Sequence, residues 1–449
     1  RRQFRIMTTP LFGWYGDDFT GATDTLPALE HAGLRAMLFL GVPGNEALAA
    51  AGPLDAVGIA GAARSMAPDA MRAELAGVGR FFQTLATPVL HYKVCSTFDS
   101  APQVGNIACA IATLLPSVQH RWVPIVAGQP SLGRYCAFSN LFAAAGTGGT
   151  VHRIDRHPTM RQHPVTPMGE ADLRLHLAAQ GLHNIGALHY PHYAAPADTL
   201  DATVAPWLQQ PLLMDVADAA HLAPVGRLLW QQAQHARLLA VGSSVVAQAL
   251  LAHWRTTGTL PASAGTPAAA PTLATAGIGP VFALAGSLSP LTARQVAAAR
   301  SYARITVDAQ GLAGDAAYAS ALLQEVGQHL DAGQHVLVCT APTSHGAADT
   351  SQAGRVAHAS ARLVADVLAR QAAQGRPLRR VGIAGGDTSS HAVEALDLWG
   401  LSCRATLCPG VTLSRAHSAN PALDGLELML KGGQMGGDDL FEQLLRPLP

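Results

Sequence analysis

The stretch LFGWYGDDFTGATD, residues 11–24, joins a short apolar run to two adjacent acids and a sequence that opens a helix. The apolar run predicts a buried strand ending at Asp17 and Asp18, and Thr20-Gly21 then begins the helix. Repeated alternation of strand and helix favours parallel sheets with crossover helices. The alternation continues along the chain. We therefore predict an α/β protein with two domains, each with a mostly parallel sheet flanked by helices.

A segment without helical or strand periodicity divides the chain. Residues 256–280 are rich in Pro, Gly, Ala and Thr, a composition typical of a linker or surface loop. We therefore predict a first domain at residues 1–255 and a second domain at residues 281–449.

Each predicted domain contains its own strand–helix series. Strands are expected at 11–16, 35–41, 55–60, 89–94, 122–127, 211–215 and 237–242, and then at 281–286, 303–308, 335–340, 380–385 and 426–431. Helices are expected at 21–32, 68–84, 103–115, 169–180 and 244–254, and then at 291–301, 314–330, 354–373, 388–398 and 437–446.

The composition excludes several classes of protein. The 449 residues carry 30 basic and 30 acidic side chains, with no Lys- or Arg-rich run. Nucleic-acid binding needs a basic surface that neutralises phosphates, so we expect no nucleic-acid partner. No apolar run reaches the roughly 18 residues of a membrane span, and the start RRQFRIMTTP lacks the apolar centre of a signal peptide. With six cysteines that form no C-x-x-C, we expect a cytoplasmic protein with reduced thiols and no membrane partner.

Lysine is rare in this chain. Lys93 and Lys431 are the two lysines among the 30 basic residues. Where any cation suffices the chain uses arginine, so we expect these two to perform tasks that a planar guanidinium cannot. The alternative is that their survival reflects chance.

The pair Asp17 and Asp18 is the predicted catalytic group. Two adjacent carboxylates repel each other unless a cation, a substrate hydroxyl or Mg²⁺ lies near, and one of them can take a proton from an alcohol. The alternative is that Asp18 or Thr20 merely caps the following helix. A phosphatase-type D-x-D nucleophile is disfavoured because Phe19 occupies the second acidic position.

Polar residues also follow the strand in HYKVCSTFDSAPQVGN, residues 91–106. A cation with hydroxyls and free N–H groups at a helix start suits a carboxylate ligand. The alternative is a lysine stem packed on apolar surface beside an ordinary Ser/Thr cap. The predicted substrate-binding set is Lys93, Ser96, Thr97, Asp99 and, after another strand, Arg64.

The segment HRIDRHPTMRQHPVTPMGEADL, residues 152–173, concentrates arginine and histidine in a charge-poor chain. Its prolines prevent a regular helix across most of it, and rigid polar loops of this kind often border active sites. The histidine spacings fit no standard metal site, so no metal ligand is assigned. A metal-dependent hydrolase built on residues 152–163 and a plain solvated loop remain alternatives.

Glycine-containing turns recur in the second domain. Glycines let the backbone approach a ligand, and a helix N-terminus favours phosphate. The chain contains neither G-x-x-x-x-G-K-[ST] nor G-x-G-x-x-G, so we predict an ATP site of another kind. The predicted nucleotide-binding residues are Ser287, Gly385, Gly386, Asp387, Thr388, Gly410, Lys431, Gly432 and Gly433.

Taken together, these motifs resemble those of the four-carbon acid sugar kinase family. The resemblance covers both halves of the chain in order. It rests on D-D-F-T-G-A at 17–22, K-V-C-S-T-F-D-S at 93–100, H-P-V-T-P-M at 163–168, G-S-L-S at 286–289, G-G-D-T-S at 385–389, P-G-V at 409–411 and K-G-G at 431–433.

The resemblance implies an N-terminal substrate domain, a C-terminal nucleotide domain, and use of ATP with Mg²⁺ to phosphorylate a terminal hydroxyl of a small sugar acid. The motifs at 93–100 and 163–168 are those of a branch that acts on 3-oxo-tetronate. Segments 128–143 and 154–160 are similar to a sub-branch that acts on 3-oxo-isoapionate, so both acceptors stay open. The chain departs from the family pattern after P-G-V, where Thr412-Leu413 replaces the usual Pro-Trp.

Two other classes of function stay open. A two-domain NAD-dependent dehydrogenase is one, although the absent G-x-G-x-x-G counts against it. A non-catalytic sugar-acid sensor is the other. The oligomeric state also stays open, with a homodimer among the expectations.

Overall fold

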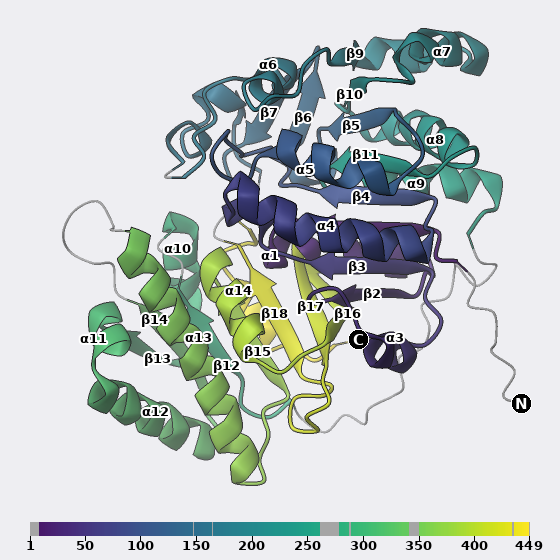
Figure 1. Cartoon of the computed structure of the whole chain (residues 1–449). Helices are drawn as coiled ribbons and strands as arrows, with labels where there is room; N and C mark the ends of the chain where they lie inside the picture. Colours follow the sequence, from purple (N-terminus) through teal and green to yellow (C-terminus); the bar gives the residue numbers. More distant parts are fainter. Residues whose placement is uncertain are drawn as a thin grey trace, which may run out of the picture. The chain divides into compact units, whose positions relative to one another are not determined.

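The computed structural model describes residues 9–146, 148–163, 165–260, 278–286, 289–340, 350–432 and 435–448, without the side chains of 350–353 and 387. The chain divides into two compact units, Arg1–Ala269 and Ala270–Pro449. Each unit has a mostly parallel sheet flanked by helices (Figure 1), which confirms the predicted fold class. Most of the predicted linker, residues 261–277, lies outside the described residues.

The sheet of the first unit is parallel throughout, in the order β2-β3-β1-β4-β11-β5-β10-β9. Its central strands are buried along their whole length, as expected for a sheet covered on both faces. The strands are β1 (Phe12–Gly16), β2 (Ala36–Phe39), β3 (Ala56–Ala60), β4 (Val89–Lys93), β5 (Val123–Ala127), β9 (Gly186–Leu188), β10 (Pro211–Asp215) and β11 (Leu238–Gly242).

Helices cover both faces of this sheet. They are α1 (Phe19–Ala22), α2 (Thr25–His31), α3 (Asn45–Ala51), α4 (Pro68–Leu85), α5 (Ile107–Leu114), α6 (Leu173–Ala178), α7 (Ala197–Val204), α8 (Leu222–Ala233) and α9 (Val245–Thr257). The connections β3–α4–β4 and β4–α5–β5 move one way along the sheet, and β1–α2–β2 moves the other way. Right-handed crossovers then place α4 and α5 on one face and α2 on the opposite face. Helix α4 packs against α5 (Figure 1), and α2 packs against α9.

This winding singles out the end of β1. The helix after β1 lies on one face, and the helices after its neighbours β3 and β4 lie on the other. Ligands of open α/β sheets bind at such reversals, beyond the carboxyl ends of the strands. Asp17 and Asp18 follow β1 directly, so the fold puts the predicted catalytic pair at this position.

A small antiparallel sheet is inserted between β5 and β9. It contains β6 (Arg134–Ala137), β7 (Asn140–Ala144) and β8 (Val151–Arg153), in that order. No strand was predicted from the sequence in this region.

The second unit has a parallel sheet with an antiparallel hairpin at one side, in the order β13-β14-β12-β15-β18-β17-β16. Its strands are β12 (Phe282–Ala285), β13 (Tyr302–Val307), β14 (His335–Thr340), β15 (Arg380–Ala384), β16 (Gly400–Cys408), β17 (Val411–His417) and β18 (Glu427–Lys431). Its helices are α10 (Pro290–Ala298), α11 (Ala309–Gly314), α12 (Ala316–Asp331), α13 (Thr350–Ala373), α14 (Gly386–Ala395) and α15 (Leu440–Leu444).

The winding reverses in this unit at β12. Helix α10 follows β12 and packs with α15, whereas α13 and α14, which follow the neighbouring strands β14 and β15, pack with each other. By the same rule we expect a ligand at the end of β12 in the second unit.

Several predicted elements differ from those observed. The helix predicted at 21–32 is two short helices, α1 and α2, because Asp18 caps a first turn that ends at Thr23. The hairpin at 400–417 was not predicted, nor were α3, α7 and α8.

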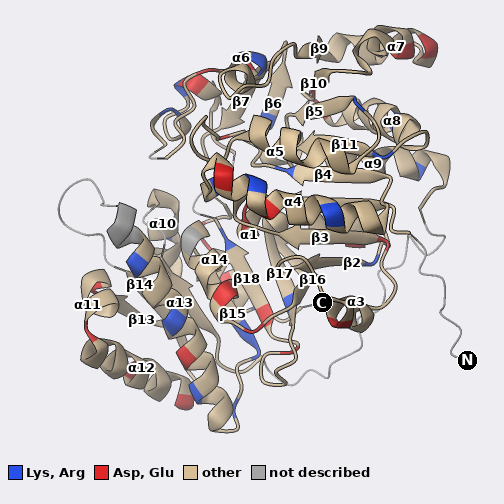
Figure 2. Ribbon diagram, viewed as in Figure 1, with Lys and Arg blue, Asp and Glu red and all other residues tan. Residues whose placement is uncertain are grey.

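Charged residues do not form a stripe of one sign on α4. Asp69, Arg72, Glu74 and Arg80 alternate along this helix (Figure 2). Within the described ranges, no helix combines the length and the apolar character needed to cross a membrane.

Candidate active site

The acidic pair at the end of β1 is held by one arginine. Arg64, which follows β3, contacts Asp17 through Nη2–Oδ1 at 2.6 Å and Nε–Oδ2 at 3.3 Å. Its third nitrogen, Nη1, lies 2.5 Å from Asp18 Oδ2. The backbone fixes the same arrangement, because the Arg64 N–H donates to the Asp17 carbonyl at 2.9 Å. All three guanidinium nitrogens of Arg64 are therefore used by the two acids.

The two carboxylates have different environments. Asp18 Oδ1 accepts hydrogen bonds from Thr20 Oγ1 and from the Gly21 N–H, both at 2.6 Å. Asp18 is thus the cap of α1, as the alternative reading of the sequence had it, and it also pairs with Arg64. Asp17 is buried and has Arg64 as its side-chain partner.

These environments separate the pKa values of the pair. Burial is the largest influence on Asp17 and, opposed by Arg64 and reinforced by Asp18, raises its pKa to about 6. Burial also acts to raise the pKa of Asp18, but the charges of Arg64 and Lys93 with the bonds from Thr20 and Gly21 outweigh it and lower that pKa. Of the two, Asp17 is the carboxylate whose pKa suits a general base near neutral pH.

Lys93 lies beside this pair at the end of β4. Strand β4 pairs with β1 so that Lys93 is opposite Gly16, and the side chain is 2% exposed. Its Nζ lies 3.4 Å from Asp24 Oδ2. Burial acts to lower the pKa of Lys93, and the surrounding Asp24, Asp18 and Asp17 reverse the effect and raise it. Sequence reasoning missed Asp24, although it ends the same quoted stretch.

The hydroxyl segment after β4 is partly engaged with itself. Thr97 Oγ1 donates to Asp99 Oδ1 at 2.5 Å and lies 3.0 Å from Cys95 Sγ. Burial acts to raise the pKa of Asp99, but Arg64 and the Thr97 bond outweigh it and lower that pKa. The structure therefore places Asp99 close enough to Arg64 for their charges to interact, with Thr97 bonded to Asp99. Ser96, between Cys95 and Thr97, is partly buried.

The polar segment 152–163 is held by an internal ion pair and by a contact with β7. Arg153 pairs with Asp155 at 2.5 Å, and the His157 ring lies 3.3 Å from the Ala144 carbonyl. Across the part of the chain that the structure describes, no group of three or more His, Cys, Asp or Glu side chains is arranged to hold a metal ion.

Three neighbouring strands of the second unit end in the predicted nucleotide residues. Strand β15 lies between β12 and β18, with Ala384 opposite both Ala285 and Lys431. Gly286 therefore lies beside Gly385, and the Gly385 N–H donates to the Lys431 carbonyl at 2.8 Å.

The turn between β15 and α14 requires glycine. Gly385 has φ 127°, a conformation that side chains rarely adopt. A Cβ on Gly286 would lie 2.3 Å from Thr388 Oγ1, whereas a Cβ on Gly386 or Gly432 would meet nothing within 4 Å. Thr388 thus packs against the backbone at Gly286, while the backbone is open at Gly386, the first residue of α14. The N-terminus of a helix favours an anion.

Lys431, the last residue of β18, is buried at this end of the sheet. Its Nζ donates to Thr292 Oγ1 at 2.8 Å, and the side chain is 1% exposed. Burial lowers the pKa of Lys431 to about 8. Thr292 is in the first turn of α10, and its N–H donates to Ser289 Oγ at 3.1 Å. Lys431 thereby links the start of α10 to the end of β18.

The other predicted nucleotide residues include Gly410, which the structure describes. Gly410 has φ 78° in the turn between β16 and β17. Since β17 is antiparallel to β18, with Leu413 opposite Met429, this turn lies at the edge where β18 ends. Ser287 and Gly433 lie outside the described residues, and so does the side chain of Asp387.

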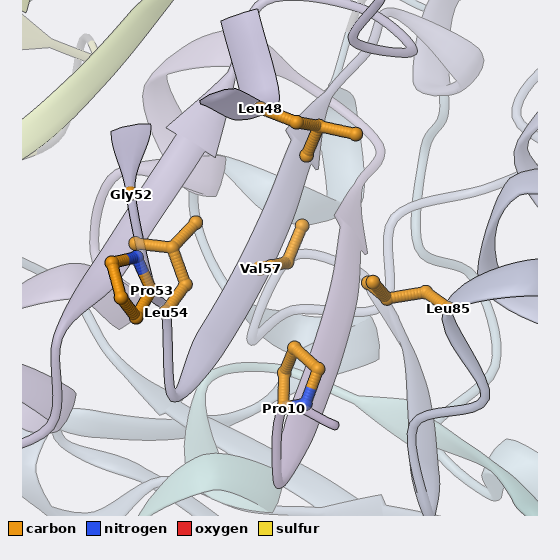
Figure 3. Close-up of a pocket in the computed structure, with 7 residues that line it drawn as sticks. All are labelled: Pro10, Leu48, Gly52, Pro53, Leu54, Val57 and Leu85. Carbon is orange, nitrogen blue, oxygen red and sulfur yellow. The ribbon is translucent and has the colours of Figure 1, made fainter. Parts of the chain in front are cut away.

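A small pocket lies elsewhere (Figure 3). It is lined by Pro10, Leu48, Gly52, Pro53, Leu54, Val57 and Leu85. Pro10 and Leu54 precede β1 and β3, so the pocket is at the amino ends of these strands, opposite the edge that carries Asp17. Its apolar lining offers no group for acid–base chemistry.

Two family models match this chain and divide it as the two sites do. A sugar-binding N-terminal domain matches residues 12–250, and a nucleotide-binding C-terminal domain matches residues 282–441. The chain belongs to the four-carbon acid sugar kinase family. The resemblance found in the motifs is thus confirmed, and the first model contains Asp17, Arg64 and Lys93 while the second contains Lys431.

Relatives in the four-carbon acid sugar kinase family match over nearly the whole chain. A 3-oxo-isoapionate kinase from Paraburkholderia graminis is 40% identical over 447 residues, which are 96% of this chain and 93% of the relative. A 3-oxo-tetronate kinase from Cupriavidus necator is 32% identical, over 98% of this chain and 97% of the relative. A crystal structure of a protein from Salmonella typhimurium LT2 has a TM-score of 0.75 and 25% identity, over 97% of this chain and 98% of that chain.

Proposed function

We propose that this chain is an ATP-dependent kinase that phosphorylates a terminal hydroxyl of a small 3-oxo sugar acid. The observation that carries the proposal is Asp17, a buried carboxylate at the end of β1 whose pKa is raised to about 6 and whose orientation is fixed by Arg64. Such a group is ionised at neutral pH, yet basic enough to accept a proton from an alcohol as its oxygen attacks phosphorus.

The chemical step divides between the residues of the two sites. The acceptor hydroxyl transfers its proton to a carboxylate oxygen of Asp17 while its own oxygen forms the bond to the γ-phosphorus. The bond between that phosphorus and the β,γ-bridging oxygen breaks, and ADP leaves. Phosphoryl transfer depends mainly on positioning and on stabilising charge, which rigid strand ends and buried cations supply.

The edge of the second unit suits a triphosphate. A Cβ on Gly386 or Gly432 would meet nothing within 4 Å, α14 begins without a side-chain cap among the described residues, and Lys431 adds a buried cation. Mg²⁺ would be held mainly by the phosphate oxygens, as is usual for this ion, because the described residues present no protein cluster for a metal. When bound, Mg²⁺ supplies neutralisation of phosphate charge.

Identity to the relatives favours 3-oxo-isoapionate as the acceptor, since the kinase named for it is 40% identical, against 32% for the 3-oxo-tetronate kinase. A coupled ADP-release assay with each acid, in matched reactions with and without ATP and acid, tests the proposal. We expect ADP release that requires the acid. The kcat/KM should be higher for 3-oxo-isoapionate than for 3-oxo-tetronate, which is the second candidate.

Acid-dependent release of ADP distinguishes this proposal from the other classes. An NAD-dependent dehydrogenase would change nicotinamide absorbance with the same acids and release no ADP. A sensor would bind the acid in calorimetry and leave ATP intact. Either result, with freshly prepared acids of both kinds, would replace the kinase proposal.

A further inference from the structure

The turn that joins β5 to β6 holds two polar side chains on one side of the backbone. Gln129 and Arg134 form an antiparallel bridge, with Gln129 N donating to Arg134 O at 2.8 Å and Arg134 N donating to Gln129 O at 3.1 Å. Directly opposed residues of an antiparallel pair project their side chains to the same face. The turn is fixed by Gly128, with φ 96°, where a Cβ would lie 1.9 Å from the Val216 carbonyl oxygen.

This turn lies along the same sheet edge as the acidic pair. Gln129 Nε2 donates to Ser244 Oγ at 2.8 Å, and Ser244 follows β11 by two residues. The last residue of β11, Gly242, is opposite Lys93 of β4. The charge of Arg134 also interacts with Cys95, beside Thr97 in the hydroxyl segment after β4.

Both side chains have polar atoms that lack a partner in the described residues. Gln129 is 2% exposed, and its Oε1 accepts no hydrogen bond. Arg134 Nε is buried without an acceptor, and its Nη1 donates to the Leu132 carbonyl at 2.6 Å. Arg134 forms no ion pair within the described ranges, and burial lowers its pKa. A buried polar atom without a hydrogen bond costs free energy, so a ligand that supplies the missing hydrogen bonds gains affinity.

The charge balance of the site points to an anion as that ligand. Four carboxylates, those of Asp17, Asp18, Asp24 and Asp99, surround two cations, and the three nitrogens of Arg64 and the ammonium of Lys93 already contact carboxylates. A sugar acid brings a further negative charge. Its carboxylate therefore needs a cation that no protein carboxylate already uses.

We infer that Arg134 binds the carboxylate of the sugar acid and that Gln129 Oε1 accepts a hydrogen bond from one of its hydroxyls. This assignment rests on the proposed function and extends the substrate site beyond the Arg64–Lys93 set to the end of β5. Arg134 supplies the planar fork for the carboxylate, and Arg64 serves to orient Asp17.

The test compares Arg134→Gln with Arg80→Gln, which removes an exposed arginine from α4. The ligands are 3-oxo-isoapionate and its carboxamide, which lacks the negative charge. Binding of each is measured by calorimetry without ATP, and kcat/KM is measured by ADP release. We expect Arg134→Gln to lower affinity for the acid by about 10- to 100-fold, the effect of a charge-assisted hydrogen bond, and to leave the KM for ATP and affinity for the carboxamide unchanged.

The outcomes separate this assignment from the kinase proposal. Wild-type protein and Arg80→Gln should prefer the acid to the carboxamide, and Arg134→Gln should lose the preference. The assignment would be overturned if Arg134→Gln lost affinity equally for the acid and the carboxamide, or lost none. It would also be overturned if the wild-type protein did not prefer the acid. Failure of ADP release with the binding preference intact would instead overturn the kinase proposal alone.

Discussion

Replacing Asp17 with Asn should strongly lower activity while making the protein more stable at neutral pH. The pKa of Asp17 is raised from 3.8 to about 6, chiefly by burial. In the unfolded chain the carboxyl ionises at its ordinary pKa, so its contribution to stability is fully present below that value and is lost as the pH rises through about 6. At about 1.4 kcal/mol per pKa unit, keeping Asp17 ionised at pH 7 costs about 3 kcal/mol.

Asn is a neutral side chain of the same shape, so Asp17→Asn should raise the free energy of unfolding at pH 7 by up to about 3 kcal/mol. At pH 4 the advantage should vanish, because the wild-type carboxyl is then protonated in the folded protein. The variant should lose about 10²- to 10⁴-fold in kcat, the usual contribution of a general base. In the wild type, kcat/KM should rise with pH through a midpoint near 6.

The matched control is Asp18→Asn. The pKa of Asp18 is lowered, so its contribution to stability is present above the unfolded pKa and is lost as the pH falls through the folded one. This variant should therefore be less stable than wild type at pH 7. Urea unfolding of both variants at pH 4 and pH 7 measures the differences. A less stable Asp17→Asn protein at pH 7, or near-normal turnover in it, would refute the reasoning.

Three further substitutions test the other contacts. Lys431→Met should raise the KM for ATP by about 10-fold or more and leave the KM for the sugar acid unchanged, and an equal rise in the two KM values would contradict this role. In the wild type, initial rates across pH should show kcat/KM for ATP falling as the pH rises through about 8. Gly286→Ala places a Cβ 2.3 Å from Thr388 Oγ1 and should cost about 1–3 kcal/mol, measured by thermal unfolding; a second change, Thr388→Ala, should recover part of the loss, and independent effects would disprove the contact. Lys93→Met leaves Asp24 without its cation and should destabilise the protein by about 3–5 kcal/mol, and a loss below 1 kcal/mol in urea unfolding would argue against a buried pair.

The sequence predicted the strand ends well because each is an apolar run stopped by polar residues. Asp17, Lys93 and Lys431 all stand at or directly after a strand, as expected. The parallel order then brings Asp17 next to Lys93, since β1 pairs with β4. Positions of this kind follow from local pattern and from the general rule for ligand sites in α/β sheets.

The hairpin of β16 and β17 was missed because its first strand has no continuous apolar run. After Gly400 and Leu401 the residues of β16 are intermediate or exposed, and the strand pairs through irregular register with β17. Helix α8 was missed for another reason. It contains Pro224 and Gly226, which usually interrupt helices, but Pro224 lies in the first turn, and Gly226 allows close approach to the Ala249 carbonyl of α9.

Contacts between side chains far apart in the sequence could not be predicted from it. Nothing local indicates that Lys93 contacts Asp24 or that Arg64 gives all three nitrogens to Asp17 and Asp18. The roles predicted for Arg64, Lys93 and the hydroxyl segment in holding the substrate remain predictions. Arg134 lies in segment 128–143, whose similarity to one sub-branch the sequence shows, but its role could not be predicted. What distinguishes Arg134 is a buried Nε without an acceptor among the described residues, beside a site whose other cations contact carboxylates.

The proposed kinase function requires a nucleotide that binds at the ends of β12, β15 and β18. A crystal structure with a non-hydrolysable ATP analogue tests this most directly. We expect the triphosphate beside Gly385–Thr388 and Lys431, with Asp17 free of nucleotide. Phosphates found instead against Asp17 and Arg64, or a protein that binds no nucleotide at millimolar concentration, would contradict it.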